Sequence, residues 1–443
     1  MKKLTFFLFT LAIGIPVFSQ HEHHAMQDSL SKVIDTMDNR HSMHTMPSHA
    51  YSKSLPMSRN GSGTGWNPDA SPMYMWLRSK GRYDWMFHGN IFLRYTSQDV
   101  FSSGSRGGDE FSSPNWFMAM MNRKVGKKGL LNATAMISLD RITDGGNGYP
   151  LLFQSGETYK GQRLIDRQHP HDLFSALSIG YTQMLNRDID VFAYLGYPGE
   201  PALGAPAFMH RISAMNNPDA PLGHHWQDAT HITFGTGTVG IRYKKFKAEG
   251  SVFTGREPDE NRFNFDGASF DSYSYRISFN PAENWALQFS QGFINSPEAL
   301  EPGEDVKRTS ASVLFVKKLK IDKHISAAAI WGLNDKGADH KENSFLLEGN
   351  YQVSKNAFFA RYEYVQKSNE ELNLGQSYPH RNFNIHGFSL GYNRRILQIK
   401  KADIAAGTQF TLYGVDKGLR SLYGKMPVGV QLYIQIRPFL HSH

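Results

Sequence analysis

Six of the 19 histidines in this 443-residue chain fall within one stretch, Asp166–His231, and most stand beside Asp, Met or Trp. Imidazole suits Zn(II), Cu(II) and Ni(II), and a carboxylate can complete such a nitrogen-based site. Three or four of these rings with one Asp would therefore hold a transition metal. The candidate ligands are His169, His171, Asp172, His210, His224, His225 and His231.

A purely structural role, without a metal, would also account for the histidines and aspartates in these loops. In a packed loop plug, His and Asp side chains satisfy buried backbone groups, and the spacing matches no established motif such as His-Glu-x-x-His. One hydrophobic hairpin, roughly residues 173–197, separates the two histidine-bearing loops. Because neighbouring strands lie about 4.8 Å apart, both loops should leave the same rim close together. We therefore predict that His169 or His171 lies within metal-bridging distance of at least two of His210, His224, His225 and His231.

The N-terminal region has a different composition and predicts a separate metal-binding segment. Residues 1–19 have the charged start, apolar segment and small residues of a secretory signal peptide. Residues 20–71 lack hydrophobic periodicity and predict a disordered periplasmic tail in which His and Met interleave. Imidazole and thioether together suit copper as Cu(II) or Cu(I), although a His-rich linker without metal would look similar. The candidate ligands here are His21, His23, His24, Met26, His41, Met43, His44, Met46 and His49.

The pattern of residues 72–443 predicts an all-β, antiparallel, up-and-down transmembrane barrel. Its loops would position the histidines of Asp166–His231. Alternation is clearest in the last strand, where Val430, Leu432 and Ile434 alternate with Gln431 and Tyr433. In a strand, these two sets face lipid and a polar lumen respectively. About 16 such segments occur, with short turns and long loops alternating between them, so we predict a barrel in the outer membrane with short turns on the periplasmic side. The predicted strands begin near residues 84, 117, 129, 172, 188, 229, 246, 270, 283, 307, 323, 343, 356, 384, 402 and 425.

This pattern resembles bacterial outer-membrane β-barrels over nearly the whole mature chain. The His- and Met-rich segment before the barrel, with Met43-His44-Thr45-Met46, is similar in layout to the copper-resistance protein B family. That resemblance implies transition-metal binding, tolerance or transport, with copper as the metal. The partners it implies are outer-membrane lipid, the metal ion and periplasmic metal-efflux components.

Other functions stay open or are disfavoured. A general porin or small-solute channel with a structural His-rich plug fits the same pattern. A barrel hydrolase built on His171, Asp172 and Ser175 is less favoured, because no Ser sits in a recognisable nucleophile turn, and we expect no enzymatic activity. The basic residues form no single face, so nucleic acid is not an expected partner. Met118 and Met120 share a strand face, near Met86 and Met136, and predict either side-chain packing or a thioether path through the lumen.

Overall fold

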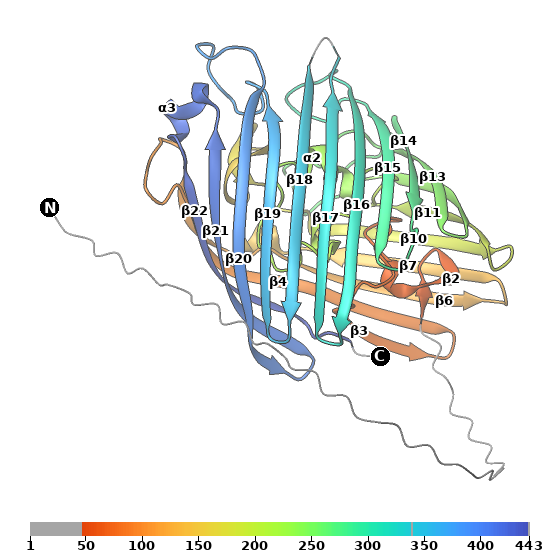
Figure 1. Ribbon diagram of the computed structural model, residues 1–443. Helices are drawn as coiled ribbons and strands as arrows, with labels where there is room; N and C mark the ends of the chain where they lie inside the picture. The colour runs from red at the N-terminus through yellow and green to blue at the C-terminus, as the bar shows by residue number, and fades with distance from the viewer. Residues whose placement is uncertain (1–46, 338–339, 442–443) are drawn as a thin grey trace, which may run out of the picture. The chain divides into compact units, whose positions relative to one another are not determined.

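Antiparallel strands close into a barrel in the computed structural model, which describes residues 47–337 and 340–441 (Figure 1). Strand β22 (Val428–Pro438) pairs with β4 (Tyr83–Gln98) to close the wall. Between them along the chain lie β6 (Asn115–Val125), β7 (Gly129–Ile137), β10 (Phe174–Met184), β11 (Ile189–Gly196), β12 (Thr236–Tyr243), β13 (Phe246–Phe253), β14 (Ser272–Phe279), β15 (Trp285–Ile294), β16 (Val306–Lys320), β17 (Lys323–Asp335), β18 (Lys341–Val353), β19 (Asn356–Lys367), β20 (Phe383–Ile399) and β21 (Ala402–Val415).

Two short strands share a wall position with a longer strand: β3 (Trp76–Lys80) with β22, and β5 (Gly108–Ser112) with β6. Strand β3 pairs with the start of β4 on the side of β22, and β5 pairs with its end on the side of β6. The wall therefore has 16 strand positions, as predicted. The predicted strand starts lie within three residues of the observed ones except at β12, which begins at Thr236 instead of near Ala229.

The wall separates apolar from polar side chains as the alternation predicts. On β18, Phe345 and Leu347 are exposed on the outside, whereas Glu348 is buried on the inside. On β22, Leu432 is exposed and Gln431 is 1% exposed. Because the sheet is closed, its strands have no unpaired edge, and because its outer face is apolar, it can contact lipid. Among the described residues, no helix is long and apolar enough to cross a membrane.

Residues 47–71, the described part of the predicted tail, are ordered, which corrects the prediction of disorder for that part; residues 20–46 lie outside the described residues. Residues 47–75 form β1 (Ser48–His49), β2 (Ser52–Pro56) and η1 (Met57–Arg59), and much of the segment is buried. Its polar groups bond to the polar inner wall: Ser52 Oγ donates to Asp190 Oδ2 at 2.5 Å, and Arg276 Nη2 donates to Thr64 Oγ1 at 2.9 Å. The segment also packs apolar side chains, among them Tyr51 and Met57, against Met86 and Phe192 of the wall.

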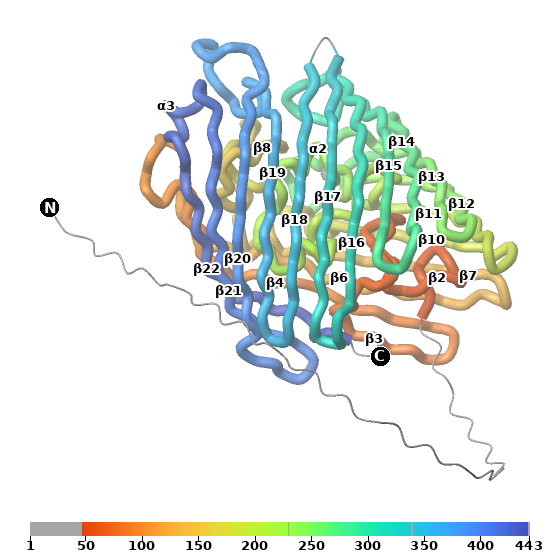
Figure 2. The backbone as a smooth tube through the Cα atoms, viewed as in Figure 1, coloured from red at the N-terminus to blue at the C-terminus, as the bar shows by residue number. Residues whose placement is uncertain are grey.

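Two loops also fold inward and, with residues 47–75, form what we call the plug (Figure 2). Residues 138–173 contain α1 (Asp140–Thr143), β8 (Tyr149–Tyr159) and β9 (Gln162–Gln168). Residues 197–235 contain η2 (Phe208–His210), α2 (His224–Gln227) and η3 (Ala229–His231). Helix α2 lies against β16, β17 and β18. Both loops leave the rim opposite the short turns, as predicted.

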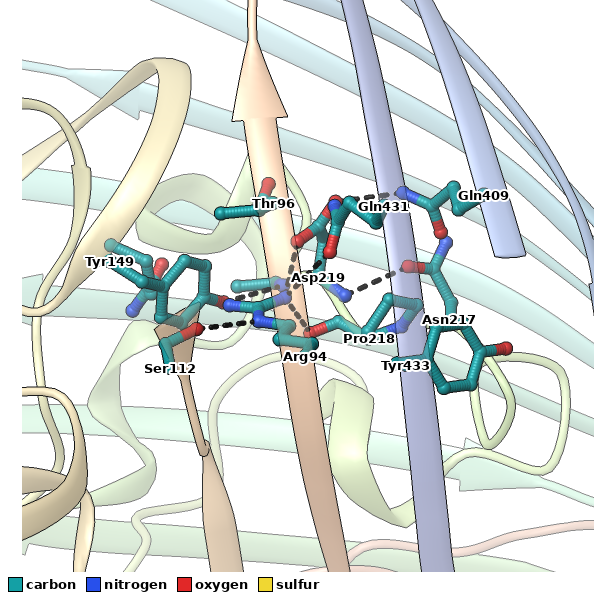
Figure 3. A network of polar contacts seen from close by, with 12 residues as sticks. Arg94, Thr96, Ser112, Tyr149, Asn217, Pro218, Asp219, Gln409, Gln431 and Tyr433 are labelled. Atoms are coloured by element: carbon teal, nitrogen blue, oxygen red, sulfur yellow. Dashed lines mark hydrogen bonds and ion pairs between the residues drawn. The ribbon is translucent and has the colours of Figure 1, made fainter. Parts of the chain in front are cut away.

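A polar network fixes the loop of residues 197–235, which we call the third loop, to the wall (Figure 3). Arg94 of β4 donates through Nη1 to Pro218 O and Asp219 Oδ1, each at 2.7 Å, and its guanidinium lies 3.7 Å from the ring centroid of Tyr149. Gln409 Nε2 donates to Asp219 Oδ2 at 2.7 Å, and Gln431 Nε2 donates to the same oxygen. One plug carboxylate is thus held by three wall strands.

Candidate metal centre

Five imidazoles from the two inward loops gather at one place in the lumen. His169 and His171 follow β9, His224 and His225 begin α2, and His231 ends η3. Ring centroids of consecutive neighbours are close: 5.5 Å for His169 and His225, 5.3 Å for His224 and His225, 5.0 Å for His224 and His231, and 5.5 Å for His171 and His231. All five side chains are buried.

Each ring uses its Nδ1 in the same way. The Nδ1 atoms meet Glu157 Oε1 (His169, 3.1 Å), Asp140 Oδ2 (His171, 2.7 Å), Asp228 Oδ1 (His224), Glu257 Oε1 (His225, 3.3 Å) and the Asp228 carbonyl (His231, 2.9 Å). These acceptors favour the tautomer with the proton on Nδ1, which leaves the Nε2 lone pair free.

The Nε2 atoms of these five rings are buried and have no hydrogen-bond partner among the described residues. A buried polar atom without a partner is costly, and five on adjacent rings cannot satisfy each other in this tautomer because all are acceptors. A metal cation satisfies such lone pairs directly. Metal-bound His characteristically donates its other ring N–H to a carboxylate or carbonyl, which is the arrangement at each of these rings.

Three of the rings form the tightest group. One ring nitrogen each from His169, His224 and His225 lie within 4.8 Å of one another. A single ion bound to all three rings would need these nitrogens at the roughly 2.0–2.1 Å of metal–imidazole bonds. The geometric prediction is therefore confirmed: His169 lies within bridging distance of two histidines of the third loop.

Burial favours the uncharged state of His169, His224 and His231. It holds the pKa of His169 and of His231 well below the usual value, and the neighbouring imidazoles lower both further. Burial also lowers the pKa of His224, although Asp228 opposes the shift. Neutral rings at pH 7 are the form that binds a metal.

Helix α2 positions two ligands through its short turn and its buried Trp226. Trp226 is 0% exposed and packs into the apolar cluster with Leu222 and Leu372, which orients the helix. Strand β8 approaches His225 at Gly156, whose φ is +110°. A Cβ there would lie 2.3 Å from His225 Cε1, so only glycine permits this approach.

A chain of buried ions connects the centre to the wall. Asp228 accepts from His224 Nδ1 and, at 2.9 Å, from Arg211 Nη1. Arg211 Nε donates to Glu348 Oε1 of β18 at 2.8 Å, and Glu348 also pairs with Arg361 of β19 at 3.1 Å. Burial alone would raise the pKa of Asp228, but His224 and Arg211 hold it below its usual range. Asp228 therefore stays ionised and fixes the His224 ring.

Of the acids near the centre that were not anticipated from the sequence, two form a ligand group with His225. His225, Glu257 and Glu298 form a second group with ligand atoms within 4.8 Å. The acids belong to the loops after β13 and β15, which the sequence marks as long loops but not as contributors to the centre. His225 thus lies between an imidazole group and a carboxylate group.

Several predicted ligands lie elsewhere. His210, on η2, is not in the cluster but faces His88 and Trp116, with ring centroids at 5.8 Å and 4.9 Å. Asp172 Oδ2 accepts from Arg262 Nη1 at 3.2 Å, so it contacts a side chain of the loop after β13 instead of joining the cluster. His49 is buried, and its Nδ1 accepts from the Tyr51 backbone N–H at 2.9 Å.

The remaining predicted ligands lie outside the described residues, as does the signal peptide. These are His21, His23, His24, Met26, His41, Met43, His44 and Met46.

The hydrolase arrangement does not form. Ser175 Oγ donates to the Asp172 carbonyl at 2.9 Å, whereas His171 Nδ1 meets Asp140. The hydroxyl, imidazole and carboxylate of the supposed triad therefore form no relay.

No protein-family profile and no curated protein matches the chain. Among solved structures, it is similar to OmpF of Salmonella typhi, with 7% identity, a TM-score of 0.48 and coverage of 81% of this chain and 100% of that one. It is also similar to a loop-deletion mutant of the outer-membrane protein OmpT of Vibrio cholerae (10%, 0.46, 81% and 99%) and to an anion-selective porin of Comamonas acidovorans (11%, 0.43, 80% and 99%).

The class of the protein rests on the structure itself. A closed antiparallel wall with 16 strand positions, an apolar exterior and a polar lumen defines an outer-membrane β-barrel. Within that class, the lumen is distinguished by a plug that carries buried histidines.

Proposed function

We propose that this outer-membrane barrel binds a transition-metal dication in its plug, with copper as the physiological metal. The observation that carries the proposal is the set of five buried Nε2 atoms without partners, each on a ring whose Nδ1 meets a carboxylate or carbonyl. Imidazole with carboxylate suits Cu(II), Zn(II) and Ni(II), and Cu(II) binds most tightly in that series.

The acids around the rings support a dication. Glu157, Glu257, Asp140 and Asp228 surround the imidazoles, and this negative charge offsets the cost of placing a metal ion away from water. A structural plug would not require ring nitrogens from two loops to lie within 4.8 Å of one another, as those of His169, His224 and His225 do. That proximity favours a metal centre over the general porin with a structural plug.

The N-terminal segment adds a second part to the proposal. The His and Met residues between His21 and Met46 offer ligands for both copper oxidation states. This composition, placed before a barrel, supports a role in copper tolerance or transport like that of the copper-resistance protein B family. Periplasmic metal-efflux components are the partners such a role would require.

The test compares metal binding by full-length protein in detergent. Wild type, stripped with a chelator and reloaded with Cu(II) or Zn(II), should hold one more tightly bound equivalent than the variant H169Q/H224Q/H225Q. The control is H380Q, because the His380 side chain is 74% exposed and pairs only at the surface with Glu370. Equal metal content and affinity in wild type and the triple variant would leave only a structural plug.

A further inference from the structure

A second histidine-bearing cavity in the lumen has seven methionines in its lining. It has a volume of about 110 Å³ and lies between residues 57–75, the third loop and the wall strands β4 and β6. The lining side chains of a type that can bind a metal are Met57, Met73, Met75, Met86, His88, Met120, Met209, His210 and Met215. We call it the methionine cavity.

A smaller cavity of about 30 Å³ continues its lining. The two share Met120, Met209 and His210. The smaller cavity is also lined by Met118, Met136 and His231. His231 belongs to the group of five buried histidines described above, which we call the imidazole centre. Thioether and imidazole side chains therefore line two adjoining cavities, the smaller of which also contacts His231.

Methionine is concentrated here beyond what packing requires. The other apolar clusters of the barrel are built from Leu, Ile, Val, Ala, Phe, Tyr and Trp and contain no methionine among the described residues. From residue 47 to residue 441, the methionines outside the two cavities are Met121, Met184 and Met426. Leucine would fill the same space with less conformational freedom, so packing alone does not explain the choice.

The wall directs these groups inward. Met86 is 1% exposed and lies on the inner face of β4 together with His88, and Met120 lies on the inner face of β6. His88 Nε2 is buried and has no hydrogen-bond partner among the described residues. The His88 ring lies 5.2 Å from the Trp116 ring and 5.8 Å from the His210 ring, between centroids.

The charges at the methionine cavity differ from those at the imidazole centre. No Asp or Glu lines it among the described residues. Its two cations are engaged elsewhere: Arg211 pairs with Asp228 and Glu348, and Arg437 Nη1 donates to Asn216 Oδ1 at 3.0 Å. A site of neutral soft ligands without a carboxylate favours a monovalent soft cation over a dication, whose desolvation would cost more.

We propose that the methionine cavity is a second metal site, which binds a soft monovalent cation, Cu(I) or Ag(I), through thioether sulfurs together with His88 and His210. The proposal does not depend on the imidazole centre. The two sites differ in ligand class and therefore in the ion each prefers.

Silver tests this proposal without a change of oxidation state. All proteins compared carry Leu in place of Met26, Met37, Met43 and Met46, so that sulfur from the N-terminal segment cannot contribute. X-ray absorption at the silver edge of this full-length background protein should show sulfur neighbours. The variant M86L/M120L/M209L should lose them, because Leu keeps the volume but removes the thioether.

The control M121L/M184L/M426L removes the same number of methionines outside the cavities and should retain sulfur-bound silver. Zinc loading should be the same in M86L/M120L/M209L and the background, whereas H169Q/H224Q/H225Q should lose zinc and keep silver on sulfur. The single variants M86L and M120L should each weaken silver binding if the triple variant folds poorly. Silver bound only to nitrogen in the background protein, or sulfur-bound silver retained in folded M86L/M120L/M209L, would overturn the proposal.

Discussion

His224 and Asp228 lie one helical turn apart, and the ring Nδ1 of the first donates to the carboxylate of the second. Both side chains are 1% exposed. The pair therefore fixes the tautomer and orientation of His224 before any metal arrives. This hydrogen bond is a direct target for mutation.

The substitution D228N should weaken metal binding at the imidazole centre by about 10–100-fold, the usual cost of losing an outer carboxylate. An amide holds His224 less firmly and removes a negative charge from the site. Calorimetric titration with Zn(II) measures the change, and D188N in an exposed turn is the control. An affinity equal to that of wild type would show that Asp228 does not orient a ligand.

The substitution G156A should displace His225 and weaken metal binding, because its Cβ would lie 2.3 Å from the ring. Gly161 provides a matched control in the same hairpin: its φ is also positive, at +71°, but a Cβ there meets nothing within 4 Å. Both variants share the backbone strain, so only the contact with His225 separates them. Metal affinity that falls equally in G156A and G161A would contradict this account.

The substitution R94A should loosen the third loop, because Asp219 would remain buried without its cation. Breaking such a pair costs about 3–5 kcal/mol. We expect a lower temperature for the heat-dependent shift in gel migration and a higher conductance in planar bilayers. The control R394A removes an exposed arginine of β20 and should change neither quantity. Unchanged conductance in R94A would mean that the plug is held without this network.

Deletion of residues 20–46 should make cells more sensitive to copper and leave permeability to small uncharged solutes unchanged. The reason is the loss of imidazole and thioether ligands, which bind copper but not Mg(II) or Ca(II). Growth under graded copper and solute uptake are the measurements. A full-length control with Asn for each His and Leu for each Met in this segment should behave like the deletion. Normal copper tolerance combined with altered solute uptake would favour a porin.

The sequence predicts the wall well because each wall residue contacts either lipid or lumen, and this alternation is local. It fails at β12 because Ile232 and Phe234 continue the apolar pattern but are buried outside the regular strand. It also fails at residues 47–71, whose order depends on polar partners far away in the chain, such as Asp190 for Ser52.

The candidate centre is predictable only in part for a related reason. The hairpin β10–β11 brings the two loops together, so the proximity of His169 to His224 and His225 follows from topology. Which acid faces which ring does not follow, because Asp140 and Glu157 come from distant points of one loop and Glu257 comes from another. His210 lies outside the histidine cluster because of how η2 is oriented in the loop, and no pattern of residues predicts that orientation.

The position of residues 47–75 inside the wall has a consequence for biogenesis. The closing seam joins the last strand, β22, to the first long strand, β4, and β3 occupies the remainder of the same position. Tyr74, at the end of the inner segment, lies under the guanidinium of Arg437 on β22, 4.3 Å from its ring centroid. Because this segment lies inside the wall beside the seam, we expect the insertion machinery to fold the barrel around it, with the seam as the last junction to form.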